Sequence, residues 1–106
     1  MEDLTQEEWS EQLAKDNNAV VLDVRTDAEV ADGIIPNAIH LDIYKGQEFI
    51  TDIEEFDKSK SYYVYCRSGN RSGQACQIME QLGFANTYNL EGGMLEWIGD
   101  IVDLKS

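Results

Sequence analysis

The sequence has few basic residues, few cysteines and a single histidine, and each of these shortages excludes a class of function. Lys and Arg number 8 against 21 Asp and Glu, which gives a formal net charge of -13. A surface of that charge repels nucleic acid and anionic lipid, so we expect neither as a partner. The two cysteines form no Cys-x-x-Cys pair and have no histidine-rich companion set. The sequence therefore predicts no metal site, no disulfide framework and no cofactor.

The sequence also lacks a long apolar run. No stretch approaches the length of a membrane span, and the acidic residues 1–4 do not resemble the start of a secretory signal. We therefore expect no membrane association and a location in the reducing cytoplasm. A length of 106 residues with 42% hydrophobic residues suits one modest core, so we expect a single domain over residues 1–106.

Segments with the pattern of strands alternate with segments with the pattern of helices. The expected strands are residues 19–24, 38–41, 62–65 and 87–90. The expected helices are residues 6–15, 27–33, 46–56, 72–82 and 94–101. Such alternation is typical of a parallel sheet whose two faces are covered by helices. We therefore predict a three-layer α/β/α fold of the α/β class, with a parallel sheet of four to five strands.

The segment around Cys66 carries the strongest functional signal. An apolar, aromatic strand ends at Cys66, and a polar loop then leads into a helix. In this position the thiol faces the unpaired N–H groups of a helix N-terminus and two guanidinium groups, those of Arg67 and Arg71, all of which favour the thiolate. Gly69 and Asn70 tolerate the turn conformations that point successive amides inward. We interpret Cys66 as a nucleophile, in preference to a buried structural cysteine beside solubilising arginines.

Other reactive or charged residues are assigned structural roles. Cys76 falls among apolar residues of the expected helix, so we favour core packing over a role as a resolving thiol. His40 is the only histidine and has no acidic pattern near it, so we expect a structural or surface role. Asp23, Arg25 and Glu29 are expected to form an ion-pair cluster that braces the sheet edge rather than to act in catalysis.

Four segments of the chain together resemble the rhodaneses, specifically the small single-domain sulfurtransferases. These segments are Asp23-Val24-Arg25 with Glu29, Gly33 to Ala38, Tyr65 to Ser72, and Leu90 to Gly93 with Trp97. The resemblance covers nearly the whole chain and implies the rhodanese-like version of the three-layer fold. The second segment departs from the family at Ile34, where histidine is frequent, and at Asn37, where glycine is frequent. We expect altered turn geometry there, although asparagine can still adopt a left-handed turn.

The resemblance implies a site and a reaction. Cys66 would carry a sulfane sulfur as a persulfide, and the substrate-binding loop around it would consist of Arg67, Ser68, Gly69, Asn70, Arg71 and Ser72. The sulfur would come from thiosulfate or a similar small anionic donor and pass to cyanide or a thiol acceptor. The related phosphatases and arsenate reductases use a loop that is one residue longer, and the shorter loop fits a persulfide better than a phosphate.

One alternative to a thiosulfate enzyme stays open at this point. The chain would then be a persulfide carrier that docks on a protein sulfur donor or acceptor, with only incidental activity toward thiosulfate. The acidic surface is the sequence feature that supports this alternative, because it suits a basic partner, although it also serves simple solvation.

Overall fold

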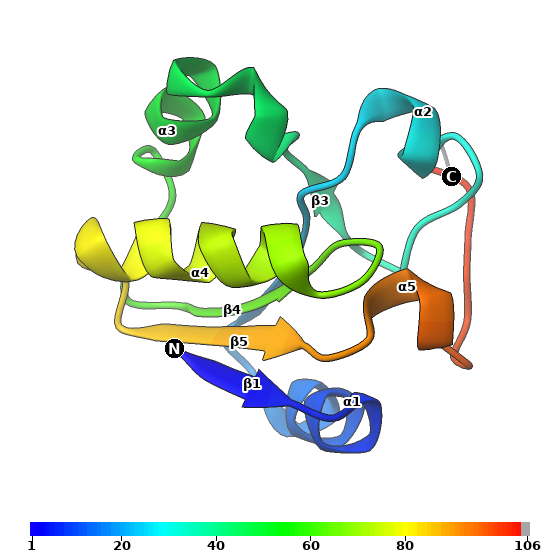
Figure 1. Ribbon diagram of the computed structural model, residues 1–106. Coiled ribbons are helices and arrows are strands. Elements are labelled where there is room, and N and C mark those ends of the chain that lie inside the picture. Colours follow the sequence, from blue (N-terminus) through cyan, green and yellow to red (C-terminus); the bar gives the residue numbers. More distant parts are fainter. Residues whose placement is uncertain (105–106) are drawn as a thin grey trace.

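A parallel sheet of five strands forms the centre of the molecule in the computed structural model, which describes residues 1–104. The strands are β1 (Glu2–Leu4), β2 (Ala19–Asp23), β3 (Ile39–His40), β4 (Ser61–Tyr65) and β5 (Asn86–Leu90). Their order across the sheet is β1-β5-β4-β2-β3, and every neighbouring pair is parallel (Figure 1). The predicted fold class and strand count are therefore confirmed.

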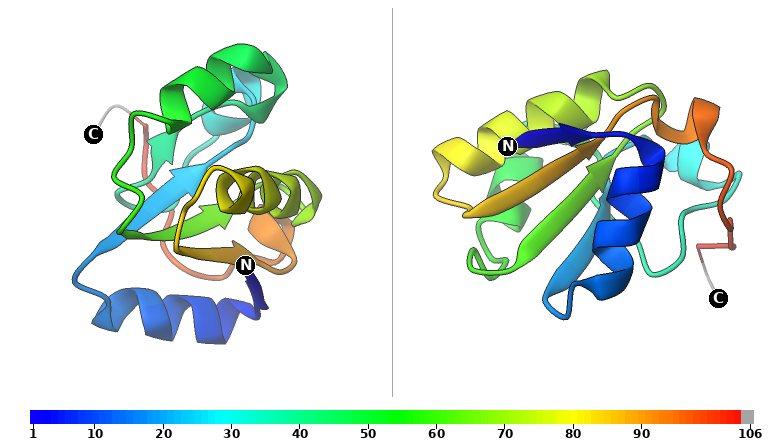
Figure 2. Two further views of the ribbon diagram at one scale, coloured as in Figure 1. Left: turned by 90° about the vertical axis from the view of Figure 1, so that its left-hand side faces the viewer. Right: turned by 90° about the horizontal axis from the view of Figure 1, so that it is seen from below.

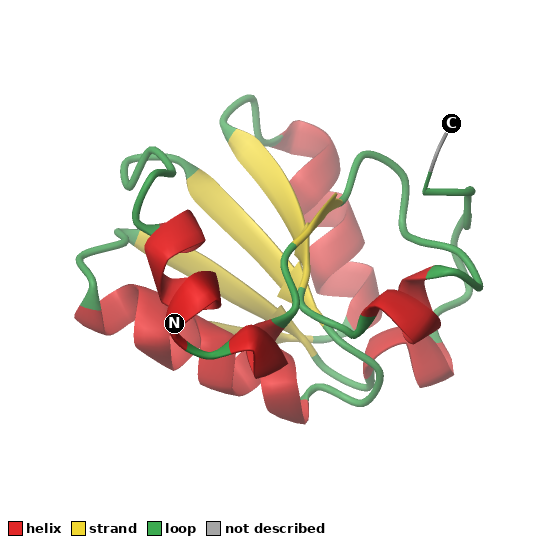
Figure 3. Cartoon of the chain, turned by 90° about the horizontal axis from the view of Figure 1, so that it is seen from above, coloured by secondary structure: helices red, strands yellow, loops and turns green. Residues whose placement is uncertain are grey.

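Helices cover both faces of this sheet, which gives the three layers. The helices are α1 (Gln6–Lys15), α2 (Asp27–Val30), the 3-10 helix η1 (Ile43–Lys45), α3 (Gln47–Ile53), α4 (Asn70–Gln81) and α5 (Gly93–Glu96). Helices α3 and α4 pack on one face, and α1 packs on the other (Figure 2). Figure 3 shows the strands enclosed between these helices when the molecule is seen from above.

The first helix is fixed by its cap and by one large aromatic residue. Thr5 and Glu8 form a capping box, in which each side chain accepts a hydrogen bond from the other residue's backbone amide. Trp9 is fully buried, and its ring meets those of Tyr63 and Trp97 edge to face with centroids 5.7 Å apart. Aromatic contacts of this kind stabilise a core beyond the area they bury, so Trp9 anchors α1 to the sheet.

The central position of β4 explains both its composition and its place in the site. Strands β2 and β5 flank β4, and residues 62–65 are all buried, as expected for a strand covered on both faces. Asp23 at the end of β2 lies opposite Tyr65 at the end of β4. The carboxyl ends of parallel strands meet at one edge, so the loops that follow β2, β4 and β5 come together there.

Several boundaries differ from expectation, and among them α2 ends at Val30 and α3 at Ile53, earlier than predicted. Strand β1 was not predicted, and α4 begins at Asn70 rather than at residue 72. The helix predicted for residues 94–101 begins close to the expected residue but is too long, because α5 ends at Glu96 and the backbone of Trp97 is extended. The chain then turns back, and Val102 pairs with Ile34 through two backbone hydrogen bonds of 2.8 and 2.9 Å. Across residues 1–104, none of the helices is long and apolar enough to cross a membrane.

Candidate active site

The cysteine loop connects β4 to α4 and folds its amides around the sulfur of Cys66. The Gly69 amide donates a hydrogen bond to Cys66 Sγ over an N–S distance of 3.1 Å. Gly69 reaches this orientation with a φ of +103°, in the left-handed region where a side chain would be strained. A Cβ there would also lie 3.4 Å from the Leu90 carbonyl oxygen. Glycine at this position lets the loop close tightly over the sulfur.

The environment of Cys66 favours its thiolate. Burial would by itself raise the pKa of the thiol, but hydrogen bonds from the Ser72 hydroxyl and from the amides of Ser72, Gly69 and Ser68 outweigh it and lower the pKa below its ordinary value. The Ser72 oxygen lies 3.3 Å from Cys66 Sγ. The start of α4 adds the positive end of its helix dipole. These groups favour the thiolate, which is the form that the predicted nucleophile needs.

A glycine-containing turn after β5 holds the cysteine loop in place through backbone hydrogen bonds. The Met94 amide donates to the Cys66 carbonyl and the Leu95 amide to the Arg67 carbonyl, each over 3.0 Å. Gly93, which starts α5, has a φ of +53°, and a Cβ at this position would meet the Arg67 carbonyl oxygen at only 2.5 Å. Cys66 itself has no exposed surface. The loop and this turn therefore enclose the sulfur.

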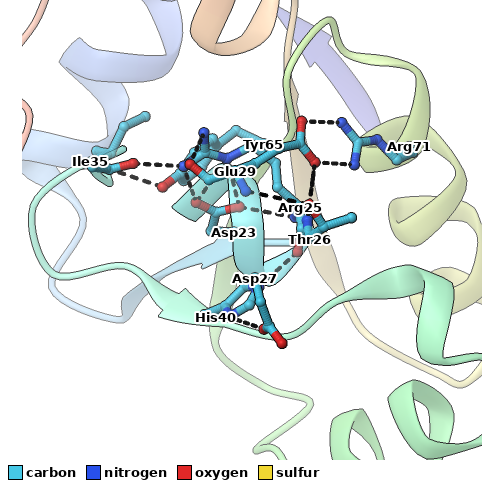
Figure 4. Close-up of polar contacts among 10 residues, drawn as sticks. Asp23, Arg25, Thr26, Asp27, Glu29, Ile35, His40, Tyr65 and Arg71 are labelled. Carbon is cyan, nitrogen blue, oxygen red and sulfur yellow. Dashed lines mark hydrogen bonds and ion pairs between the residues drawn. The ribbon is translucent and has the colours of Figure 1, made fainter. Parts of the chain in front are cut away.

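The two arginines of the loop have different surroundings. Arg71 forms a two-pronged ion pair with Glu29 of α2, with N–O distances of 2.6 and 2.8 Å (Figure 4). The hydrogen bonds from Arg71 lower the pKa of Glu29 to about 2, against the opposing effect of burial. Arg67 is exposed and has no ion-pair partner within residues 1–104. Arg67 is therefore the loop cation that is free to meet an anion.

A shallow hollow lies beside Arg67. Its volume is about 170 Å³, and it is lined by Arg25, Glu29, Asp32, Arg67, Met94 and Leu95. The hollow joins the exposed guanidinium to the α5 residues that hold the loop carbonyls. The lining carries two cations, Arg25 and Arg67, and two carboxylates, Glu29 and Asp32, and Arg67 is the exposed cation that has no ion-pair partner within residues 1–104.

The expected ion-pair cluster at the end of β2 forms only in part. Arg25 binds the buried carboxylate of Asp23 at 2.7 Å and donates to the Gly33 carbonyl oxygen at 2.8 Å. The expectation is wrong for Glu29, whose carboxylate pairs with Arg71, while Arg25 reaches only the Glu29 backbone oxygen at 3.4 Å. The cause is the short helix α2, whose first turn directs the Glu29 carboxylate toward the cysteine loop (Figure 4).

The other residues singled out in the sequence lie outside the site. Cys76 is fully buried in the core, and burial raises the pKa of its thiol to about 12, so it stays protonated at neutral pH. His40 Nε2 donates to the Arg25 carbonyl oxygen at 2.6 Å, a structural contact. Ile34 is buried and pairs with Val102, whereas Asn37 holds a left-handed φ of 70°. No cluster of three potential metal ligands occurs in the part of the chain that the structure describes.

Sequence reasoning missed two residues behind the loop, of which one contacts the loop and the other binds the first. Asn89 at the end of β5 contacts both Ser72 and the Gly69 carbonyl oxygen. Asp3 on β1 binds the Asn89 carboxamide at 2.9 Å. The position of Asn89 directly before Leu90-Glu91-Gly92-Gly93 was the available signal, because a strand end beside that turn lies at the functional edge of the sheet.

Comparison with known proteins agrees with this fold. The rhodanese-like domain model matches residues 5–100. A sulfurtransferase of Allochromatium vinosum is 36% identical over 95 residues, which cover 90% of this chain and 86% of the relative. The thiosulfate sulfurtransferase GlpE of Coxiella burnetii is 36% identical over 91 residues, which cover 86% and 80%. The crystal structure of a rhodanese-like domain protein from Staphylococcus aureus superposes with a TM-score of 0.82 at 32% identity, over 97% and 98% of the two chains.

A parallel sheet with a cysteine loop at its carboxyl edge, and the match over residues 5–100, define the class of protein. The chain belongs to the rhodanese-like domain family, as its four sequence segments predicted. Relatives in this family include longer proteins of other names. The tRNA uridine(34) hydroxylase of Legionella pneumophila is 33% identical over 106 residues, and the match spans 97% of this chain but only 41% of that protein.

Proposed function

We propose that the protein is a sulfurtransferase that moves a sulfane sulfur from thiosulfate, or a similar small anionic donor, to cyanide or a thiol acceptor through a persulfide on Cys66. The observation that carries the proposal is the set of hydrogen-bond donors around Cys66 Sγ, from Gly69 at 3.1 Å and Ser72 at 3.3 Å. Donors in this arrangement stabilise negative charge on sulfur before the reaction and again on a bound persulfide. The names of the single-domain relatives support the same reaction class.

The reaction consists of two displacements at sulfur. The Cys66 thiolate attacks the outer sulfur of thiosulfate, the sulfur–sulfur bond of the donor breaks, and sulfite leaves with the bonding electron pair. The product is a persulfide whose charge resides on the outer sulfur. Cyanide or a thiolate then attacks that outer sulfur, and Cys66 leaves as a thiolate, ready for the next cycle. Charge and atoms balance in each step without a metal or a cofactor.

The two loop arginines would have different roles in binding the donor. Arg67 is exposed at the hollow beside the loop and would attract the anion from solution. Arg71 is held by Glu29, so its role would be to keep a fixed positive charge close to Cys66 and to brace the loop. The sulfur has no exposed surface, so productive binding would also require the loop side chains to open.

Intact mass spectrometry tests the proposal directly. The reduced protein is incubated briefly with thiosulfate, and a gain of one sulfur atom, about 32 Da, is expected. The gain should disappear when cyanide is added and should be absent in Cys66→Ser. Cys76→Ser is the matched control, because the thiol of Cys76 is protonated and buried, and it should gain sulfur like the wild type. A wild type that binds no sulfur under these conditions contradicts thiosulfate as the donor.

A protein-docking persulfide carrier is the second candidate function. Two exposed apolar side chains flank the loop and favour it. Tyr44 is 70% exposed and lies over the Arg71 guanidinium at 5.4 Å, and Leu95 is 61% exposed in the hollow beside Arg67. Exposed aromatic and aliphatic residues around a reactive centre are typical of protein contact sites. Rapid loading of Cys66 by a protein persulfide donor, together with slow turnover of thiosulfate, would favour this carrier over the enzyme.

A further inference from the structure

A buried carboxamide lies behind the cysteine loop and joins parts of the chain that are distant in sequence. Asn89 on β5 contacts Asp3 of β1, the loop residue Gly69 and Ser72 of α4. Its Nδ2 lies 2.9 Å from the Asp3 carboxylate and 3.1 Å from the Gly69 carbonyl oxygen. Its Oδ1 lies 2.5 Å from the hydroxyl oxygen of Ser72.

These contacts fix the orientation of the carboxamide. A carboxylate and a carbonyl group only accept hydrogen bonds, so the nitrogen of Asn89 must face Asp3 and Gly69. The oxygen of Asn89 therefore faces Ser72. Because a carbonyl oxygen cannot donate, the proton between these two oxygens comes from the Ser72 hydroxyl.

The Ser72 hydroxyl has a second acceptor but only one proton. Cys66 Sγ lies 3.3 Å from the same hydroxyl oxygen. While Cys66 is a thiol, the hydroxyl proton can stay on Asn89 and the S–H group can point at the Ser72 oxygen. Once Cys66 is a thiolate, its sulfur only accepts, and the hydroxyl must turn away from Asn89 to stabilise it. Asn89 and the thiolate therefore compete for the same proton.

We propose that Asn89 is a positioning residue that holds the Ser72 proton away from Cys66 until the thiol ionises, so that the strength of the Asn89 acceptor sets how readily the thiolate forms. The link to sulfur transfer rests on the proposed function, whereas the competition itself concerns the resting cysteine. When a persulfide forms, its charge moves to the outer sulfur, and the proton returns to Asn89. The charged groups near Cys66 include Arg67, the next residue of the chain, Arg71 with its partner Glu29, and Asp3 behind Asn89.

Replacement of Asn89 by Leu removes the competing acceptor at similar volume. No buried group loses its last partner, because the Gly69 carbonyl also accepts from the Gly73 amide at 3.1 Å and Asp3 is exposed. Without the Asn89 acceptor, the Ser72 hydroxyl is free to donate to the Cys66 thiolate, and a hydrogen bond to a charged group is stronger than one between neutral groups. We therefore expect the midpoint of Cys66 ionisation to fall by about one pH unit. Asn89→Asp supplies a stronger acceptor and a like charge, so it should raise the midpoint by at least as much.

The ultraviolet absorbance of the thiolate, followed during a pH titration, measures this midpoint. The Cys66→Ser form of each variant serves as the blank and removes the contribution of the tyrosines. Circular dichroism and thermal unfolding verify that each variant is folded. If Asn89→Leu does not fold, Asn89→Asp is titrated with Ser72 present and with Ser72→Ala, and the proposal then requires a larger rise of the midpoint when Ser72 is present.

A double-mutant comparison separates this role from a merely structural one. In a Ser72→Ala background the shared proton is absent, so Asn89→Leu should leave the Cys66 midpoint unchanged. Asn89→Asp should keep in that background only the part of its effect that comes from the added charge. The proposal is wrong if Asn89→Leu does not lower the midpoint in the wild type, or lowers it equally in the Ser72→Ala background. If the midpoint moves as expected but thiosulfate adds no sulfur, the proposed function fails and the role of Asn89 stands.

Discussion

Replacement of Glu29 by Gln tests the ion pair that braces the cysteine loop, because the variant keeps the shape of the side chain and removes its charge. Arg71 binds both carboxylate oxygens of Glu29, at 2.6 and 2.8 Å, and joins α4 to α2 across 42 residues of sequence. Gln cannot accept two hydrogen bonds from the guanidinium in this geometry. We therefore expect a lower free energy of unfolding for the variant at neutral pH.

The size of the loss follows from the pKa of Glu29. The Arg71 hydrogen bonds are the main cause that brings this pKa from 4.5 to about 2. Because a pKa difference of one corresponds to about 1.4 kcal/mol, the ion pair contributes at most about 3 kcal/mol to the free energy of unfolding. The side chains of Glu29 and Arg71 are 25% and 16% exposed, so solvent screening reduces the effect. We expect a loss of about 1 to 2 kcal/mol.

The pH dependence of this loss carries the sharpest test. A depressed pKa means that the pair stabilises the fold above about pH 4.5 and that its contribution disappears as the pH falls toward 2. At pH 3 less than half of the difference between wild type and Glu29→Gln should remain. Urea unfolding of both proteins at pH 7 and pH 3 measures it, and the other carboxylates cancel in the comparison. An equal difference at both pH values would refute the assignment to this ion pair.

Three further predictions concern the loop. Arg67→Gln should raise the KM for thiosulfate several-fold with little change in kcat, because this exposed cation would act in binding the anion; steady-state kinetics that show a fall in kcat alone would contradict it. Ser72→Ala should raise the pKa of Cys66, and a pH titration of the thiolate that gives an unchanged midpoint would remove Ser72 from the site. Gly93→Ala should destabilise the protein by about 2 kcal/mol more than Gly46→Ala, as measured by urea unfolding. Both glycines have a positive φ, but only the Cβ added at Gly93 would clash with backbone atoms, so equal losses of stability would contradict the reasoning.

Much of the fold was predictable because its signals are local. Thr5 and Thr26 are each followed three residues later by a glutamate, which is the sequence pattern of a capping box, and both boxes form. The apolar run that precedes Cys66 is a buried strand, and the polar loop after it runs into a helix. The site could be located for the same reason, since a strand, a glycine-containing loop and a helix follow each other within residues 61–81.

The features that were missed depend on contacts between distant segments. Strand β1 has three residues, two of them acidic, and it forms only because Glu2, Asp3 and Leu4 find the free edge of β5. The segment after Glu96 leaves the helical path because its partner is Ile34, 68 residues earlier than Val102. The pairing of Glu29 with Arg71 depends likewise on how α2 and α4 meet. Local propensity does not encode such pairings.

The order of the strands also affects how readily two copies of the protein can pair through their sheet edges. An edge strand offers unpaired backbone groups on which another chain can add a strand. Here the two edges are β1, with three residues, and β3, with two, while the five-residue strands β2, β4 and β5 all lie inside. Short edges of this kind leave little backbone for intermolecular pairing. The protein therefore protects its sheet from aggregation by strand order as well as by its net charge of -13.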